Sequence, residues 1–139
     1  MDILYTAVAH GTGDGRNGHV RSDDGVIDLD LRIPKEMGGQ GGEYANPELL
    51  FAAGYAACFH SALRFVGNAE KLDVTDSEVS ATVGIGTADS GGFGLAVELD
   101  VSLPKLDEAA AKALVEKAHQ VCPYSNATRG NVDVDLRIV

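Results

Sequence analysis

Alternation of apolar and polar residues runs through several segments of the chain and predicts half-buried β-strands. The longest such segment runs from Phe93 to Leu103, and its alternating apolar residues are Phe93, Leu95, Val97, Leu99, Val101 and Leu103. Similar runs cover 27–33, 79–85 and 132–138, and a weaker one, ILYTAVA, covers 3–9. The letters SDDG at 22–25 predict a hairpin turn between strands at 18–21 and 26–33.

A helix is predicted from Asn46 onward, in the stretch NPELLFAAGYAACFHSALRFVG. Asn46 is a good N-cap residue, and Pro47 and Glu48 suit the first turn. The stretch is apolar nearly all round, which indicates burial on most sides. Gly54 inside it costs about 1 kcal/mol relative to alanine and indicates a close packing contact.

A second helix is predicted after Asp107, where apolar residues recur at helical spacing until Val121 and Pro123 then stops the helix. The order is therefore strands, helix, strands, helix, strand. This order predicts an α+β fold with a largely antiparallel sheet, in a single domain over 1–139.

The charge balance narrows the possible partners. The formal net charge is −10, from 21 acidic against 11 basic residues. Nucleic acids and anionic membrane surfaces bind clustered Lys and Arg, so neither is expected as a partner. No signal peptide is evident, and the eleven-residue uncharged run 49–59 is shorter than the roughly 18–20 residues that span a bilayer. We expect a cytoplasmic protein without a membrane partner.

The chain has two cysteines, Cys58 in the first predicted helix and Cys122 at the end of the second. Both could be small core residues, since free cysteine is among the most buried residue types. A zinc site with His60 and His119 is a second interpretation. One intervening residue turns Cys58 and His60 about 200° apart on a helix, which disfavours that site, and we expect no metal.

A redox pair is the third interpretation, and it requires a cation. A reactive thiol must ionise, but an apolar environment raises a thiol pKa. Cys58 also lies about 15 Å along the helix axis from Glu48, too far for the helix N-terminus to help. The candidate cations, among which composition does not choose, are Arg16, Arg21, Arg64 and Arg129.

Two long motifs decide between these interpretations. The stretches NPELLFAAGYAACFHSAL and KAHQVCPYSNATRGN, together with GDGRNG and GGQGGEYANPE, are found in this chain. With them the sequence resembles the organic hydroperoxide resistance (Ohr) branch of the Ohr/OsmC family over essentially its whole length. The resemblance implies antiparallel sheets wrapped around two central helices in an intertwined homodimer.

The resemblance also implies roles for individual residues. Cys58 falls on the peroxidatic thiol and Cys122 on the resolving thiol. Arg16 falls on the arginine that activates the sulfur, and Glu48 on the glutamate that pairs with it. Phe93 is a further candidate for contact with the substrate. His19 and His60 match no family role.

The implied activity is a cysteine-based peroxidase. Cys58 would reduce organic hydroperoxides to alcohols through a sulfenic acid and then a disulfide with Cys122. Dihydrolipoamide or lipoylated proteins, kept reduced by their reductase system, would recycle the disulfide, with no bound cofactor. The alternatives are an OsmC-type peroxidase of broader substrate range and a non-catalytic α+β protein whose cysteines sense oxidation.

Helix geometry bears on the assembly. Glu48 and Cys58 are ten residues apart, which on one straight helix means about 15 Å and about 80° of rotation. One arginine side chain does not bridge that span. We therefore expect either a helix break near Gly54 or an obligate dimer with Glu48 supplied in trans or near the interface.

Overall fold

The structure is a computed structural model that describes all residues from Met1 to Val139. The chain forms two compact units, Met1–Leu50 and Phe51–Val139. The boundary between them falls inside the long helix α1 (Pro47–Ala69). The single domain expected over 1–139 stays a prediction.

The first unit is built on a small antiparallel sheet. Its strands are β1 (Ala9–Thr12), β2 (His19–Ser22) and β3 (Asp28–Asp30), in the order β1-β2-β3. The predicted hairpin turn is confirmed, because the Gly25 amide donates to the Ser22 carbonyl at 2.9 Å and β2 pairs with β3. Two short 3-10 helices, η1 (Gly15–Asn17) and η2 (Lys35–Met37), occupy the glycine-rich loops.

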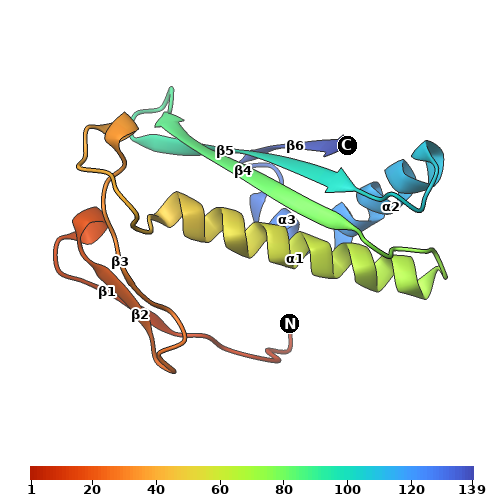
Figure 1. The fold of residues 1–139 in the computed structure, drawn as a ribbon, viewed down its shortest axis with the longest axis horizontal. Coiled ribbons are helices and arrows are strands. Elements are labelled where there is room, and N and C mark those ends of the chain that lie inside the picture. Colours follow the sequence, from red (N-terminus) through yellow and green to blue (C-terminus); the bar gives the residue numbers. More distant parts are fainter. The chain divides into compact units, whose positions relative to one another are not determined.

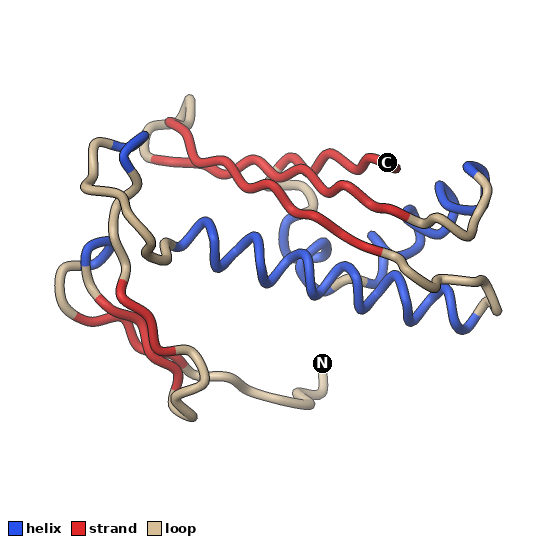
Figure 2. The backbone as a smooth tube through the Cα atoms, in the orientation of Figure 1, coloured by secondary structure: helices blue, strands red, loops and turns tan.

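The strand expected at 3–9 is wrong. Residues 1–8 form no regular structure, and β1 begins only at Ala9 (Figure 2). Ile3, Leu4 and Tyr5 are exposed. Alternation predicts a strand only where one face is buried, and these residues cover no core.

Helix α1 begins as the sequence indicated. The Leu49 amide donates to the Asn46 side-chain oxygen at 2.8 Å, and Pro47 is the first helical residue. The helix passes through Gly54 without a break, so the helix break expected there is wrong.

The expected burial of α1 on most sides is also wrong for the single chain. Its buried residues are Tyr55, Phe59, Ala62, Leu63 and Gly67, which recur at helical spacing and form one face. Leu49 and Phe65 lie elsewhere on the helix and are 55% and 69% exposed. An apolar surface of α1 therefore stays uncovered within one chain.

The second unit packs helices against one side of a three-stranded sheet (Figure 1). The strands β4 (Glu78–Thr87), β5 (Phe93–Ser102) and β6 (Asp133–Ile138) follow in that order, and all three were predicted. β4 pairs antiparallel with β5, whereas β6 pairs parallel with β5. Val97, Leu99 and Val101 of β5 are buried against the helices.

The connection from β5 to β6 contains two helices, α2 (Glu108–Val121) and α3 (Pro123–Thr128). A crossover of this kind allows the parallel pairing of β5 with β6. Asp107 caps α2, accepting from the Ala110 amide at 2.8 Å, as predicted. Pro123 ends α2 but also starts α3, which the sequence analysis missed. Proline is suited to a first helical position as well as to stopping a helix.

Helix α1 is long and apolar enough to cross a membrane by length and composition, with a mean hydropathy of 1.4 over the best window. The uncharged run 49–59, which is too short to span a bilayer, is only part of this helix, which has 23 residues. The core helix of a soluble protein meets the same criterion, and the face of α1 around Phe59 and Leu63 does pack in the core.

Candidate active site

The fold brings the two cysteines together. Cys58 on α1 and Cys122 between α2 and α3 are both free thiols, and their sulfur atoms lie 3.6 Å apart. A disulfide needs about 2.05 Å between the sulfurs, so a small approach would join them. Cys58 is partly accessible, whereas Cys122 is fully buried. Unequal exposure suits one thiol to meet a substrate and the other to act after it.

Local structure holds Cys122 at this position. It ends α2, where its amide donates to the Ala118 carbonyl at 2.8 Å. It also precedes α3, where its carbonyl accepts from the Asn126 amide at 2.9 Å. Pro123 fixes the backbone between the two helices. The thiol is therefore held by backbone on both sides.

A buried polar network ties α1 to α3 beside the thiols. The Tyr55 hydroxyl lies 2.9 Å from the Ser125 hydroxyl and 3.2 Å from the Thr128 hydroxyl. Thr128 in turn donates to the Tyr124 carbonyl at 3.0 Å. No role was predicted for these residues from the sequence. The only sequence signal was that all four fall inside the two long motifs around Cys58 and Cys122.

The surroundings of Cys58 act on its pKa in both directions. Burial raises the pKa of the Cys58 thiol, and the neighbouring Cys122 thiol adds to the rise. The backbone of Tyr124 acts in the opposite direction and lowers the pKa. The net direction is upward, as the sequence analysis expected for an apolar site. No cation from the same unit is among the influences on the Cys58 pKa.

Arg16 and Glu48 form a two-point ion pair in the first unit. Arg16 Nη1 donates to Glu48 Oε2 at 2.9 Å, and Nη2 donates to Oε1 at 2.7 Å. The hydrogen bonds from Arg16 lower the pKa of the Glu48 carboxyl, and those to Glu48 raise the pKa of Arg16. Both residues belong to one chain, so the pair itself needs no second subunit.

The loop that carries Arg16 is itself anchored. The Asn17 side-chain oxygen accepts from the Ile33 amide at 3.1 Å, and Arg32 donates to the Asn17 carbonyl at 3.3 Å. Gly18 closes η1, where a Cβ would lie 2.1 Å from the Thr12 carbonyl oxygen. No other residue fits at position 18 without moving that loop.

Comparison with known proteins places these features in a family. The model of the OsmC-like protein family matches residues 39–137. The chain is 52% identical to the organic hydroperoxide resistance protein of Xanthomonas axonopodis pv. citri (strain 306), over 98% of this chain and 95% of that protein. The chain belongs to the organic hydroperoxide resistance branch of the OsmC-like family.

Solved structures of family members agree with the fold. One is an organic hydroperoxide resistance protein from Elizabethkingia anophelis with bound thiocyanate. It has 54% identity and a TM-score of 0.95, covering 99% of this chain and 98% of that one. Another, from Vibrio cholerae, holds captopril in one of its active sites. It has 47% identity and a TM-score of 0.93, covering 99% and 94% of the two chains.

The other candidate arginines have partners of their own. Arg21 faces Asp28 at 3.7 Å, and Arg64 donates to the Val74 carbonyl at 3.2 Å. Arg129 donates to the His119 carbonyl at 2.6 Å and to the Asn126 side chain at 2.8 Å. Among the four candidates, only Arg16 forms a bidentate pair with a carboxylate that the family resemblance also singled out.

The histidines near the cysteines in sequence do not form a metal site with them. His60 lies 3.0 Å from the Ser77 hydroxyl, and burial lowers the pKa of His119. No group of three or more His, Cys, Asp or Glu side chains is arranged to hold a metal ion. The two free thiols contact each other.

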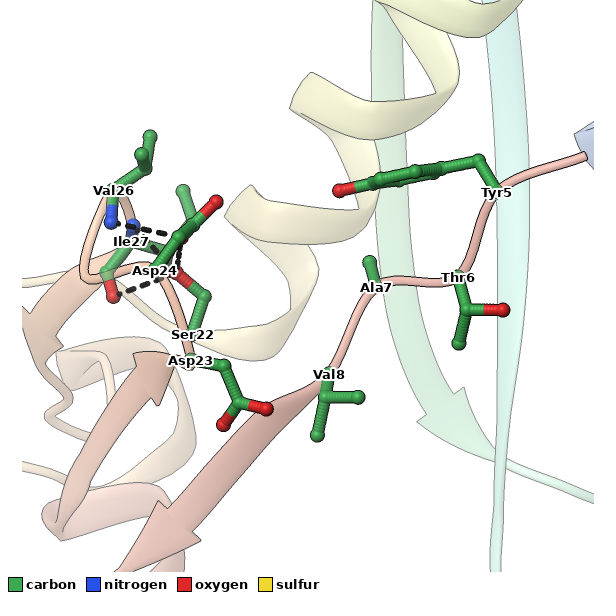
Figure 3. Close-up of a pocket in the computed structure, with 9 residues that line it drawn as sticks. All are labelled: Tyr5, Thr6, Ala7, Val8, Ser22, Asp23, Asp24, Val26 and Ile27. Atoms are coloured by element: carbon green, nitrogen blue, oxygen red, sulfur yellow. Dashed lines mark hydrogen bonds between the residues drawn. The ribbon is translucent and has the colours of Figure 1, made fainter.

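Neither Phe93 nor the surface hollow in the first unit is connected to the thiols by a contact. Phe93 starts β5, is 73% exposed and lies outside the core cluster against which Cys58 packs, so its contact with a substrate stays a prediction. A hollow of about 460 Å³ in the first unit lies between residues 5–8 and the turn at 22–27 (Figure 3). None of the predicted site residues lines it.

Proposed function

We propose that this family member is a thiol peroxidase that reduces organic hydroperoxides to alcohols. The observation that supports it most is the pair of free thiols 3.6 Å apart, one accessible and one buried. Membership of the organic hydroperoxide resistance branch supplies the substrate class.

In the proposed reaction Cys58 attacks as the thiolate. Its sulfur bonds to the terminal peroxide oxygen, the O–O bond breaks, and the alkoxide takes a proton and leaves as the alcohol. Cys58 is then a sulfenic acid. The Cys122 thiol attacks that sulfur, water leaves, and a Cys58–Cys122 disulfide forms. The sum is peroxide plus two thiols giving alcohol, water and one disulfide.

Arg16 is proposed to supply the cation that Cys58 lacks. Two of its guanidinium N–H groups bind Glu48, and a guanidinium carries five, so three stay available for the sulfur or the peroxide. Such donors would stabilise the thiolate and the departing alkoxide. Glu48 would hold the guanidinium in a fixed orientation.

Aromatic residues near the thiols favour organic substrates. The rings of Phe51, Tyr55 and Tyr124 pack together, with centroids 5.7–6.1 Å apart, around the turn of α1 that precedes Cys58. Apolar walls bind a hydrocarbon tail better than they bind hydrogen peroxide. This observation favours the proposed activity over an OsmC-type peroxidase of broader range.

Turnover requires a reductant for the disulfide, and we propose a dihydrolipoyl dithiol, free or attached to a protein. A dithiol attacks through one sulfur, displaces a protein thiol and then closes to its own disulfide, so no third reactant is needed. The same chemistry separates the enzyme from a non-catalytic redox sensor, which would be oxidised once and not recycled rapidly.

The test is a peroxidase assay with cumene hydroperoxide and dihydrolipoamide. Cys58→Ser should abolish turnover, because the attacking sulfur is lost. Cys122→Ser should consume one equivalent of peroxide per chain and accumulate oxidised Cys58, detectable by a sulfenic acid reagent and by mass spectrometry.

Hydrogen peroxide serves as the matched substrate. Cys58→Ser is the control variant and should show no turnover with either cumene hydroperoxide or hydrogen peroxide. Normal turnover by Cys122→Ser with dihydrolipoamide would contradict the resolving role. Equal efficiency with hydrogen peroxide would contradict the preference for organic substrates.

A further inference from the structure

Arg129 crosses the corner between α2 and α3. Its Nη2 donates to the His119 carbonyl at 2.6 Å, and its Nη1 donates to the Asn126 side-chain oxygen at 2.8 Å. Its own amide donates to the Ser125 carbonyl at 2.9 Å, which fixes its backbone at the end of α3. The side chain therefore folds back from the end of α3 to the last turn of α2.

The His119 carbonyl is one that α2 itself leaves without a donor. The amide four residues on would normally bond it, but that residue is Pro123, which has no N–H. The backbone has also left the helical region at Cys122, where φ is −61° and ψ is 122°. Arg129 supplies the missing donor, and its positive charge lies at the negative end of the α2 dipole. The proline that separates the two helices thus leaves free the acceptor that Arg129 binds.

Cys122 lies inside this corner. Its amide donates to the Ala118 carbonyl at 2.8 Å, and its carbonyl accepts from the Asn126 amide at 2.9 Å. Arg129 thus holds both the residue three positions before Cys122 and the residue four positions after it. The Cys122 sulfur lies 3.6 Å from that of Cys58, and a disulfide needs about 2.05 Å between them. A change in the angle between α2 and α3 would therefore alter the approach that joins the two sulfurs.

We infer that Arg129 is a positioning residue for the second thiol, because it holds the corner of α2 and α3 closed and so keeps Cys122 within reach of Cys58. None of its hydrogen bonds goes to either sulfur, so it acts through the backbone that carries Cys122. The inference rests on the proposed function only in taking a disulfide between the two cysteines as the product. It concerns how fast that disulfide closes.

The experiment follows disulfide closure without peroxide. Dithiodipyridine, a small aromatic disulfide, first forms a mixed disulfide with the partly accessible Cys58 and releases one thiopyridone. The Cys122 thiol then attacks the Cys58 sulfur, releases a second thiopyridone and leaves the Cys58–Cys122 disulfide. Stopped-flow absorbance resolves the two releases, because only the first depends on the reagent concentration. Since no peroxide is used, a failure of the peroxidase proposal would not affect this result.

Removing Arg129 should slow the closing step alone. In Arg129→Ala we expect the second release to slow about fivefold, the effect of losing about one hydrogen bond, while the first release keeps its rate. Asn126→Ala removes only one of the two partners of Arg129 and should slow the second release by less. The matched control is Arg64→Ala, because Arg64 is also an exposed arginine of the second unit that donates to a backbone carbonyl, that of Val74. It should leave both releases unchanged.

Three outcomes would overturn the inference. One is an unchanged second release in folded Arg129→Ala, and another is an equal slowing of both releases, which would indicate a general loss of structure. The third is the same slowing of the second release in Arg64→Ala. If circular dichroism shows that Arg129→Ala does not fold, Arg129→Gln decides alone. Its shorter side chain carries a single NH2 group in place of the two-pronged guanidinium, and an unchanged second release there has the same consequence.

Discussion

At the scale of single residues, the chemistry depends on how opposing influences on one thiol balance. Burial raises the pKa of Cys58, and the backbone of Tyr124 acts in the opposite direction. A thiol in that balance is a poor nucleophile near neutral pH unless a cation is added. Arg16 is the arginine that we propose for this, because its pairing with Glu48 fixes the guanidinium while leaving three donors unused.

Replacing Arg16 should therefore change the thiol more than replacing any other arginine. We expect Arg16→Ala to raise the Cys58 pKa and to slow peroxide reduction by orders of magnitude. Arg21→Ala is the matched control, because Arg21 lies in the same unit and faces Asp28 at 3.7 Å. Thiolate absorbance of both variants gives the answer, and a large shift in Arg21→Ala alone would assign the cation to Arg21.

At the scale of elements, the hairpin that follows the Arg16 loop contains a charged cluster. His19 on β2 lies between two carboxylates of β3, with Nδ1 2.8 Å from Asp30 and Nε2 2.5 Å from Asp28. Opposite His19 on β1 stands the neutral Thr12, and Arg21 also faces Asp28. Hydrogen bonds to Asp30 and Asp28 raise the pKa of His19.

The sign of the resulting pH dependence follows from that shift. A group whose pKa is higher in the folded state stabilises it fully below the unfolded value, about 6.5 for histidine. The contribution is lost as pH rises through the higher folded pKa. Above it, neutral His19 has a single N–H and leaves one carboxylate without a donor.

We therefore expect the melting temperature of the wild-type protein to exceed that of His19→Asn by most at mildly acidic pH. The difference should shrink as pH rises, because the imidazolium that bridges Asp28 and Asp30 loses its charge. Thermal unfolding of both proteins over a pH series measures it. A difference that stayed constant or grew with pH would contradict the bridging role of His19.

At the scale of the whole molecule, the main feature of one chain is the apolar surface of α1 that the chain itself does not cover. The helix buries one face and leaves Leu49 and Phe65 largely exposed. Burying apolar area is worth about 25 cal/mol per Å², so such a surface favours association. The helix is continuous, so of the two alternatives, a break near Gly54 or a dimer, only the dimer remains. The Arg16–Glu48 pair forms within one chain, so it is the pair as a whole that a second chain would meet. The exposed apolar surface independently favours a dimer.

We still expect an obligate dimer. Sedimentation at micromolar concentration should give twice the chain mass of 14.5 kDa. Phe65→Asp should shift the protein toward the monomer, because it would bury a charge in the interface. Phe93→Asp, equally exposed but on β5, is the comparison. A monomer with full peroxidase activity would contradict the expectation.

The sequence by itself determined most of the elements and indicated the candidate reactive residues. Asn46 and Asp107 cap their helices as their side chains indicated, because capping is a local interaction between neighbours. The alternation in 79–85 and 93–103 correctly predicted strands that bury one face. Cys58, Cys122, Arg16 and Glu48 were selected because they stand in specific motifs, and their roles stay predictions.

Tertiary structure alone decided which of these residues meet. The 3.6 Å contact of the thiols joins residues 64 positions apart, and no local rule specifies it. The parallel pairing of β6 with β5 likewise depends on a partner distant in sequence, and residues 3–8 form no strand because they have no such partner. Gly54 shows the same division: its presence in a helix suggested a close contact, but only the folded chain identified Tyr124 as the side chain that occupies the space.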